Sequence, residues 1–282
     1  MQDPIIVIGA ARSGTKFIRD ILGASHDLAV VPYDVNFIWR LGNEQVPHDR
    51  LTPEQVSDAL AQTLQHRLAR AARLKRTDKR RMIEKTVSNT IRVPFVDRVF
   101  PRARYIQLIR DGRDVTESSA RQWQAATDWP YLLGKLTYFP LTNMRYASRF
   151  ALDRLRGSKN KKHVAIWGPK YPGIEDDLSR EGVVSVCARQ WTCCVEQAQA
   201  DLAAIPEERV MTVRYEDLVA SEEPFAALCH FAGLSDTAHV MEAYRARVLR
   251  DTSGKWQSRM DEMARQQMLE IITPTLDKLG YL

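Results

Sequence analysis

The most informative segment of the sequence is Ile5-Ile-Val-Ile-Gly-Ala-Ala-Arg-Ser-Gly-Thr-Lys16. Its first four residues are all apolar and precede a glycine, a pattern typical of a parallel strand that is buried on both faces. Residues 16–22 then place apolar side chains at helical spacing, which predicts a helix directly after the loop. Strand, glycine-bounded loop and helix together predict a phosphate-binding loop, because backbone N–H groups and the helix N-terminus would face the anion.

The loop differs from the P-loop of nucleoside triphosphatases, which requires G-x-x-x-x-G-K-[ST]. Here Thr15 and Lys16 follow Gly14 in the reverse order, so a lysine is absent from the position that contacts the β- and γ-phosphates. Arg12 supplies positive charge inside the loop instead. Two interpretations stay open: an anion-binding loop of another kind, or a tight turn that only packs.

Further apolar runs and turn signals predict that strands and helices alternate along the chain. The predicted strands are residues 5–8, 82–84, 105–109, 164–167 and 209–215. The predicted helices are residues 16–22, a helix that starts at Thr52 and carries Val56, Leu60, Leu64 and Leu68, residues 89–100 with an interruption at Pro94, a helix through Val115, Ser119 and Trp123, and residues 187–205, 224–232 and 261–279. The alternation predicts one α/β domain over residues 1–282, with a doubly wound, mostly parallel sheet and a helical insert at residues 128–157.

The charge of the chain narrows the class of its partners. The formal net charge of the 282 residues is +6, which favours an anionic ligand. Basic residues concentrate in the last part of the second predicted helix and directly after it, at Arg67, Arg70, Arg73, Lys75, Arg76 and Lys79-Arg-Arg81. This run is interpreted either as a solvated surface or as a docking site for an acidic acceptor. The familiar nucleic-acid recognition motifs are absent from the sequence, so no nucleic-acid partner is expected.

The remaining composition predicts a metal-free cytoplasmic protein. The four cysteines lack the spacing of a zinc site and are expected to be reduced thiols. The chain passes from Met1-Gln-Asp3 directly into the first strand, without the basic and apolar regions of a signal peptide. No stretch has the length and apolarity of a transmembrane helix.

A second segment with possible phosphate chemistry is Tyr105-Ile-Gln-Leu-Ile-Arg-Asp-Gly-Arg-Asp-Val-Thr-Glu-Ser118. It places Arg110 at the end of a predicted strand and Ser118 eight residues later. An arginine offers a forked set of N–H donors to phosphate oxygens, and a serine adds a hydroxyl donor. By itself an arginine and a serine at this spacing would not indicate a phosphate site. Because they follow a predicted phosphate-binding loop in the same chain, they indicate a second phosphate contact.

The two segments together resemble the donor-binding motifs of the PAPS-dependent sulfotransferases, where PAPS is 3′-phosphoadenosine 5′-phosphosulfate. The segment Arg12-Ser-Gly-Thr15 resembles the family's 5′-phosphosulfate loop, usually [KR]-[ST]-G-T-[TS]. It departs from that pattern at Lys16, where the family commonly has a hydroxyl residue. Arg110 and Ser118 match the spacing of the family's 3′-phosphate motif. A contact with the 3′-phosphate would separate PAPS from ATP.

Three shorter segments follow the order found in the family. Glu84-Lys-Thr86 with Asn89 resembles an E-K-T-P-x-N element, although Val87 replaces the proline. Arg214-Tyr-Glu-Asp-Leu-Val219 resembles an R-Y-E-D-L segment. Thr252-Ser-Gly-Lys-Trp256 is similar to a G-[KR]-W loop whose cation closes over the donor. The resemblance covers nearly the whole chain and is weakest between residues 123 and 183.

This resemblance implies a set of site residues. The donor-binding residues would be Arg12, Ser13, Gly14, Thr15, Lys16, Arg110, Ser118 and Lys255. Arg12 and the loop amides would hold the 5′-phosphate leaving group. Lys85 would stabilise charge on the bridging and sulfuryl oxygens, and sulfuryl transfer would proceed by in-line displacement, as in phosphoryl transfer.

The general base is the least defined part of this site. Family members that act on small phenols and alcohols have a histidine two residues after the lysine, where this chain has Val87. Other members use a glutamate shortly after the first helix, and Asp34 is the carboxylate at that distance. Asp34 is therefore the predicted catalytic base, with a turn-capping aspartate as the alternative interpretation. His26 is a more remote candidate.

The predicted activity is transfer of a sulfuryl group from PAPS to an acceptor hydroxyl, with release of PAP. The acceptor class stays open among a saccharide, a lipid-linked glycan, a small-molecule alcohol and a peptide tyrosine. A carbohydrate or lipid-linked glycan is favoured, because the histidine of the small-phenol enzymes is missing and the basic helix suits an anionic acceptor. The rigid loop at residues 167–173 is interpreted as an acceptor-recognition loop or a structural turn. Two alternative functions are a P-loop kinase or ATPase using ATP and magnesium, and a non-catalytic nucleotide- or nucleic-acid-binding protein.

Overall fold

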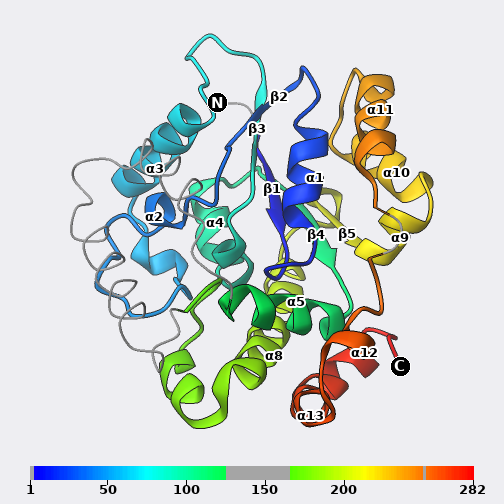
Figure 1. Cartoon of the computed structure of the whole chain (residues 1–282). Coiled ribbons are helices and arrows are strands. Elements are labelled where there is room, and N and C mark those ends of the chain that lie inside the picture. Colours follow the sequence, from blue (N-terminus) through cyan, green and yellow to red (C-terminus); the bar gives the residue numbers. More distant parts are fainter. Residues whose placement is uncertain (1–2, 125–165, 250–251) are drawn as a thin grey trace.

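The sheet of this protein is parallel throughout, in a computed structural model that describes residues 3–124, 166–249 and 252–282. The described part contains a five-stranded sheet with the order β2-β3-β1-β4-β5. Its strands are β1 (Ile5–Ile8), β2 (Leu28–Val30), β3 (Arg81–Glu84), β4 (Arg104–Ile109) and β5 (Val210–Arg214). Because all five strands run in one direction, the loops that follow them meet at one edge of the sheet (Figure 1).

Helices cover both faces of the sheet, because successive residues of β1 point to opposite sides. Ile5 and Val7 pack in one apolar cluster, while Ile6 and Ile8 pack in another. The helices on the first face are α1 (Thr15–Leu22), α9 (Tyr215–Ala220), α10 (Glu223–Phe231) and α11 (Thr237–Arg247). Those on the second face are α2 (Asn36–Trp39), α3 (Asp58–Ala71) and α4 (Val93–Val99).

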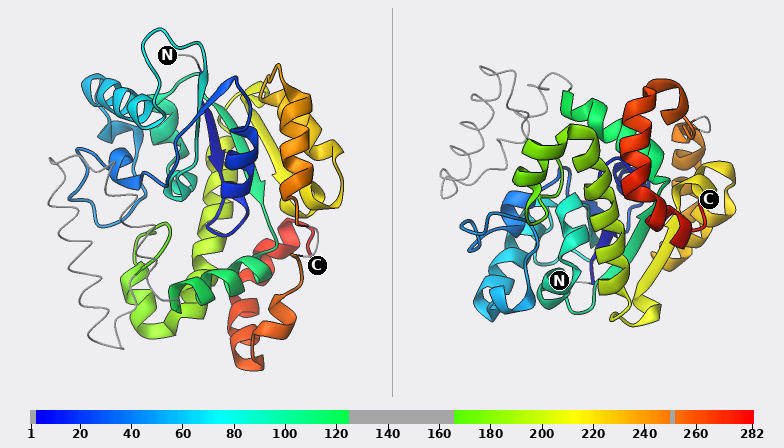
Figure 2. Two further views of the ribbon diagram at one scale, coloured as in Figure 1. Left: turned by 45° about the horizontal axis from the view of Figure 1, so that its top comes forward. Right: turned by 90° about the horizontal axis from the view of Figure 1, so that it is seen from below.

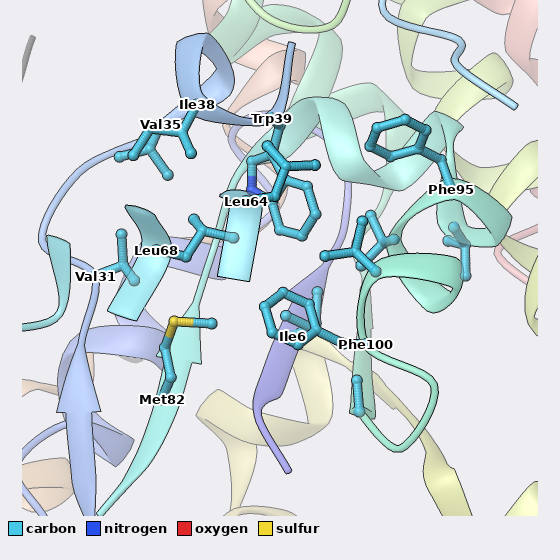
Figure 3. Packing of buried hydrophobic residues seen from close by; sticks show 14 of the residues in the cluster. Ile6, Val31, Val35, Ile38, Trp39, Leu64, Leu68, Met82, Phe95 and Phe100 are labelled. Atoms are coloured by element: carbon cyan, nitrogen blue, oxygen red, sulfur yellow. The ribbon is translucent and has the colours of Figure 1, made fainter. Parts of the chain in front are cut away.

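The core on the second face is built around large side chains. Ile6 lies among residues from α2, α3 and the end of α4, including Trp39, Leu64 and Phe100 (Figure 3). These side chains are at most 4% exposed. Their complete burial fixes α2 and α3 against the sheet, and with them the loop that follows β2.

A third layer lies beyond the ends of the strands where the loops meet. It consists of α5 (Gly112–Gln124), most of α8 (Ile174–Leu202), α12 (Trp256–Arg259) and α13 (Glu262–Lys278) (Figures 1 and 2). The last turns of α8 extend over the second face of the sheet, where Ala198 and Leu202 belong to the cluster of Ile6 and Ile8. Trp191 of α8 packs with Val115 of α5 and Met268 of α13, so these three helices share one apolar cluster. The main chain of α8 departs from helical geometry at Gly182, where φ is 84°.

The α/β fold with its parallel sheet, predicted from the sequence, is confirmed. The strands expected at residues 5–8, 82–84, 105–109 and 209–215 correspond to β1, β3, β4 and β5. The helix expected at 187–205 is the second part of the longer α8, and those at 224–232 and 261–279 are α10 and α13. The helical insert predicted for residues 128–157 lies outside the described residues.

The prediction that a helix starts at Thr52 is wrong for the first turn, because α3 begins only at Asp58. Thr52 caps only a short 3-10 turn, η1 (Pro53–Gln55), in which the Gln55 side chain accepts from the Thr52 amide at 2.7 Å. Val56 is extended, and Ser57 then caps α3 by accepting from the Leu60 amide. Two capping signals follow one another closely here, and the second one begins the helix.

The helix expected at residues 89–100 is divided. Its first part belongs to a 3-10 turn, η2 (Val87–Ile91), and its second part is α4. Pro94 is near the start of α4, where a missing backbone N–H costs nothing, so it begins a helix instead of interrupting one.

The strand expected at residues 164–167 is not found in its described part, Ile166 and Trp167. The carbonyl of Trp167 accepts a hydrogen bond from the Gln190 side chain of α8, and Gly168 follows with φ 85°. Residues 164 and 165 lie outside the described part. In addition, β2, α2, α11 and α12 were not predicted.

The described helices include none that combines the length and the apolar character needed to cross a membrane.

Candidate active site

The loop after β1 is a tight turn that ends at the N-terminus of α1. The Ser13 amide donates to the Ala10 carbonyl at 3.2 Å, and Arg12 and Gly14 have positive φ values of 70° and 95°. A Cβ atom at Gly14 would lie 2.6 Å from the ring of Tyr215. Glycine is therefore required there both by its backbone conformation and by the neighbouring ring.

The side chains of this loop divide into two groups. Ser13 and Thr15 are buried, whereas Arg12 and Lys16 are exposed. The Ser13 hydroxyl is buried, and none of the described residues offers it a hydrogen bond. A buried hydroxyl without a partner is uncommon, and it marks a place where a polar group of a ligand would be stabilised.

The two segments predicted to bind phosphate meet in the structure. Arg12 Nε donates to Ser118 Oγ at 3.0 Å, and Arg110 Nη1 donates to the Arg12 carbonyl at 3.3 Å. Burial lowers the pKa of the Arg12 guanidinium, and the nearby charges of Arg121 and Arg110 lower it further. A concentration of positive charge that depresses an arginine pKa favours a bound anion.

Arg110 is held by aromatic and backbone groups. Its guanidinium lies over the Tyr215 ring, 4.3 Å from the centroid, and its Nη2 donates to the Thr252 carbonyl at 2.7 Å. The Tyr215 hydroxyl is in turn 3.1 Å from Thr252 Oγ1. The buried Arg110 Nε has no partner. We call Arg12, Arg110, Ser118, Tyr215 and Thr252 the donor-side cluster.

The loop that carries Lys255 is attached to the same region through Asp114 of α5. This carboxylate accepts from the Gly254 amide at 2.8 Å and from the Trp256 amide at 3.3 Å. The Arg113 guanidinium lies over the Trp256 ring at 5.3 Å. Lys255 is thus held beside α5, the helix that carries Ser118, and its side chain is partly exposed.

A buried polar network lies beneath the loop after β3. The Glu84 carboxylate accepts from Thr86 Oγ1 at 2.5 Å and from Asn89 Nδ2 at 2.9 Å, which explains the spacing of the E-K-T and asparagine residues. Arg92 donates to the Asn89 side chain, and Arg92 Nη2 donates to Asn36 Oδ1 at 2.7 Å. The members of this network, Glu84, Thr86, Asn89 and Arg92, are at most 1% exposed.

Burial is the main influence on the two charges of this network. Burial and the nearby charge of Asp34 together raise the pKa of Glu84 to about 7, against the hydrogen bond from Thr86. Burial lowers the pKa of Arg92 to about 10. The network is removed from water, so its hydrogen bonds come from its own members, and Arg92 Nη1 is left without a partner among the described residues.

Lys85 and Asp34, predicted as catalytic residues from distant parts of the sequence, form an ion pair. Lys85 Nζ lies 3.6 Å from Asp34 Oδ2. The same carboxylate accepts from the Val87 amide at 3.0 Å and from the Asn36 amide at 3.3 Å. Asp34 therefore joins the loop after β2 to the loop after β3, and both side chains are partly accessible, at 24% for Asp34 and 12% for Lys85.

The loop of Lys85 also contacts the phosphate loop. Thr90 Oγ1 accepts from the Gly9 amide at 3.1 Å and donates to the Gly9 carbonyl at 3.0 Å. The sequence signals at residues 9–16, 84–89, 110–118 and 252–256 are therefore assembled at the same edge of the sheet (Figure 1). In parallel α/β sheets this edge is the usual ligand-binding edge.

His26 is not part of this site. It precedes β2 and so lies at the opposite edge of the sheet, where its ring is 3.1 Å from Asp236 and stacks on His239. The basic run after α3 also precedes a strand, β3, and lies at that opposite edge. The run is therefore remote from the loops predicted to bind the donor, and its role as a docking site for an acidic acceptor stays a prediction.

The loop at residues 167–173 is anchored more firmly than expected. Its Lys170 amide donates to Asp49 Oδ2 at 2.9 Å, and its Pro169 carbonyl accepts from Gln190 at 2.8 Å. Asp49 is buried, which by itself would raise its pKa, but the charge of Arg92 and the hydrogen bond from Asn36 lower that pKa below its ordinary value. This loop is therefore fixed to the residues that surround the buried network.

Sequence reasoning missed Asp114, Tyr215 and Thr252. Tyr215 and Thr252 stood inside segments that resembled the family, but nothing in the sequence indicated that they contact Arg110. A groove of about 950 Å³ lies elsewhere, between α8 and α13, and none of the predicted site residues lines it. Among the described residues, no three histidine, cysteine or carboxylate side chains gather as a metal site would require.

Comparison with known proteins identifies the family. The model of the sulfotransferase family matches residues 4–157, more than half of the chain. No curated protein matches the chain in sequence. The sulfotransferase domain from the curacin biosynthetic pathway is similar in fold, with a TM-score of 0.53 at 14% identity and coverage of 98% of each chain.

Two mycobacterial sulfotransferases are also similar in fold. The one from Mycobacterium avium has a TM-score of 0.52 at 14% identity, covering 98% of this chain and 76% of that one. The one from Mycobacterium tuberculosis H37Rv has a TM-score of 0.51 at 15% identity, covering 96% of this chain and 77% of that one. The structural matches show the fold, and the sequence match over residues 4–157 shows that the chain belongs to the sulfotransferase family.

Proposed function

We propose that this chain transfers a sulfuryl group from PAPS to the hydroxyl of an acceptor and releases PAP. Membership of the sulfotransferase family supports sulfuryl transfer. The choice of PAPS as donor rests on the arrangement of the donor-side cluster, and the roles of individual residues rest on their contacts.

The observation that carries the donor assignment is the contact between Arg12 and Ser118. Arg12 belongs to the predicted 5′-phosphosulfate loop and Ser118 to the predicted 3′-phosphate motif, and their side chains are joined at 3.0 Å. A ligand bound by both motifs must carry two anionic groups a short distance apart. PAPS carries them on the 5′ and 3′ positions of one ribose, whereas the phosphates of ATP form a single chain.

The described residues have hydrogen-bonding capacity to spare for such a ligand. The Ser13 hydroxyl and Arg110 Nε are buried and unpartnered, and Gly14 keeps the loop free of a side chain that would collide with Tyr215. Ser13, Gly14, Thr15 and Lys16 would bind the 5′-phosphosulfate with Arg12 at their centre. Arg110, Ser118 and Lys255 would bind the 3′-phosphate, and arginine suits this role because it donates two parallel hydrogen bonds to phosphate.

Lys85 and Asp34 would act on the reacting atoms. The acceptor oxygen forms a bond to sulfur while the bond between sulfur and the 5′-phosphate oxygen breaks. Lys85 would donate hydrogen bonds to the departing oxygen, where negative charge develops. Asp34 would accept the proton of the acceptor hydroxyl at Oδ1 or Oδ2. Their separation of 3.6 Å supports a role for both in one reaction centre.

For the acceptor, we propose a carbohydrate or a glycolipid hydroxyl. The position two residues after Lys85 holds Val87, which is 8% exposed and whose amide contacts Asp34. An apolar side chain there cannot take the role of the histidine found in members that act on small phenols. With the basic run located at the other edge of the sheet, this substitution is the feature that supports the acceptor class.

The proposal is tested by calorimetric titration of the protein with PAP, AMP and ATP, the last with magnesium. AMP is PAP without its 3′-phosphate. PAP is expected to bind more tightly than AMP by at least about tenfold, because charge-assisted hydrogen bonds to the 3′-phosphate contribute about 1.5–3 kcal/mol. Arg110→Ala should reduce the PAP affinity by a similar factor and leave AMP binding nearly unchanged.

Arg98→Ala is the matched control, because it removes an exposed arginine whose only described ion pair is with Asp58 on α3. It should bind PAP like the unmodified protein. Equal affinities for PAP and AMP, or magnesium-dependent binding of ATP at the affinity of PAP, would reject PAPS as the donor.

A further inference from the structure

The positive charge of this protein is concentrated in one segment. Residues 67–81 contain 8 of the 41 basic residues and 1 of the 35 acidic residues, a net charge of +7. The rest of the chain, with 33 basic and 34 acidic residues, has a net charge of −1, so the formal net charge of +6 comes entirely from this segment.

These basic side chains lie on one continuous segment, and all except those of Arg67 and Arg81 are exposed. It extends from the last turns of α3 through the loop that leads to β3, and this loop projects beyond the edge of the sheet (Figure 1). We call it the basic edge patch, and it consists of Arg67, Arg70, Arg73, Lys75, Arg76, Lys79 and Arg80. Arg81 is excluded because its side chain turns inward and donates to the carbonyls of Ala232 and Gly233.

Contacts inside the fold do not account for most of the patch. Asp78 pairs with Arg80 at 2.7 Å and is the only acidic residue in the segment. Among the described residues, no carboxylate lies within ion-pair distance of Arg67, Arg70, Arg76 or Lys79. The C-terminal dipole of α3 stabilises basic residues in its last turn, but it does not extend to residues 75–80. The like charges of Arg67, Arg70, Arg76 and Lys79 therefore repel one another, and no carboxylate of the described residues compensates them by an ion pair.

The patch is also separate from the proposed active site. The loops that bind the donor follow β1, β3 and β4, whereas the patch precedes β3 at the opposite edge of the sheet. The six-residue strand β4 alone spans about 20 Å. An anionic donor bound at the active site is thus beyond the reach of these side chains, and the patch requires a partner of its own.

We propose that the basic edge patch docks the protein on a membrane surface that contains anionic phospholipids. Clusters of this many lysine and arginine residues bind such surfaces electrostatically, and arginine donates well to phosphate headgroups. A projecting loop can contact a plane without a complementary groove. Residues 67–81 include no aromatic side chain on which nucleic-acid bases could stack, which disfavours single-stranded nucleic acid as the partner.

Docking in this orientation has a consequence for the acceptor. With the patch on the membrane, the opposite edge of the sheet faces the water, so donor and acceptor enter from the aqueous side. Of the two acceptor classes proposed above, this orientation fits a carbohydrate better than a lipid anchored in the same membrane. The docking itself does not depend on the proposed function, because it uses none of the proposed site residues.

The experiment is co-sedimentation of the full chain with vesicles of phosphatidylcholine alone or mixed with phosphatidylglycerol. The protein is expected to sediment with the mixed vesicles only, and added salt should release it because exposed charges are screened. The triple variant Lys75→Gln, Arg76→Gln, Lys79→Gln removes three exposed charges from the loop and should weaken binding more than about tenfold.

The matched control is Arg180→Gln, Arg247→Gln, Lys278→Gln, which removes the same charge from α8, α11 and α13. It should sediment like the unmodified chain, and both variants should bind PAP unchanged. Sedimentation with neutral vesicles to the same extent, no effect of the triple variant, or binding to duplex DNA without binding to either vesicle would overturn the proposal.

Discussion

Arg110 and Arg92 are both largely enclosed arginines close to the ligand-binding edge of the sheet, but their partners differ. Arg110 donates to the backbone carbonyls of Arg12 and Thr252 and lies over the ring of Tyr215. Arg92 is 1% exposed and donates to the side chains of Asn89 and Asn36 inside the buried network.

The comparison distinguishes an arginine that is free to bind a ligand from one that stabilises the fold. A neutral carbonyl is a weaker partner for a guanidinium than a phosphate is, so Arg110 can exchange its partners for a ligand. Arg92 has no such freedom, because any group that lost its hydrogen bonds would stay buried without a partner. The donor-side cluster is therefore expected to control ligand affinity, and the buried network to control stability and the position of Lys85 and Asp34.

The largest effect is expected at the centre of the buried network. Arg92→Met should lower the free energy of unfolding by about 4 kcal/mol, because it leaves the side-chain oxygens of Asn89 and Asn36 without their buried donor and removes a positive charge near Asp49. Urea unfolding measures this change. Arg98→Met, on the exposed side of α4, the helix that Arg92 directly precedes, is the control and should change stability by less than about 0.5 kcal/mol. Equal effects of the two substitutions would show that Arg92 contributes no more to stability than an exposed arginine does.

The next effect should appear in the rate alone. Lys85→Met keeps the length of the side chain but removes its charge, so kcat for sulfuryl transfer should fall at least about 100-fold, or about 3 kcal/mol in activation free energy. PAP affinity should change little, since the donor-side cluster is intact. Lys278→Met serves as the control lysine. A loss of PAP binding equal to the loss of rate would place Lys85 among the binding residues instead.

Stability should also depend on pH through Glu84. Its pKa is raised from an ordinary 4.5 to about 7 in the folded protein, chiefly by burial. Between these values the folded state holds a proton that the unfolded state has released, so stability is highest below pH 4.5 for this group and falls as pH rises through 7. The loss is at most about 3 kcal/mol.

Glu84→Gln should abolish this dependence, because the amide does not titrate. The measurement is the difference in unfolding free energy between the two proteins as a function of pH. That difference should change in favour of the variant as pH increases from 5 to 8. A difference that stays constant with pH would show that Glu84 is ionised throughout and that its partners compensate its burial.

The smallest effect is expected where the donor-side cluster depends on a docked loop. Asp114→Asn weakens the contacts to the Gly254 and Trp256 amides by removing the charge of the acceptor, at about 1 kcal/mol. PAP should bind about fivefold more weakly, because Lys255 is less well positioned. Ser253→Ala, in the exposed part of the same loop, should leave the affinity unchanged. If the free energy of unfolding falls by more than the free energy of PAP binding, Asp114 stabilises the fold instead of positioning Lys255.

The accuracy of the sequence-based predictions followed the range of the interactions. β1 and β4 were predicted because uninterrupted apolar residues suffice to identify a buried strand. β2 was missed because it has only three residues and pairs with β3 alone, so it exists through its partner. The start of α3 was misplaced because Thr52 and Ser57 are both good capping residues, and the local sequence does not rank them.

The candidate site divides in the same way. Arg12, Gly14, Arg110 and Lys85 were singled out by motifs within short segments. Their contacts were not predictable, because Arg12 meets Ser118 across 106 positions of sequence. Tyr215 and Thr252 show what the sequence could not predict. They contact Arg110 at the end of β4, and Tyr215 reaches it because β5 pairs with β4.

The sequence by itself determined which loops are proposed to bind the donor, their location after apolar strands, and the concentration of the net charge in one basic segment. Those properties depend on the order of neighbouring residues. The tertiary structure decided which side chains meet: the ion pair of Lys85 with Asp34, the burial of Glu84 and Arg92, and the separation of the basic edge patch from the active site. They depend on the order and direction of strands in the sheet, which arise only when distant segments pack together.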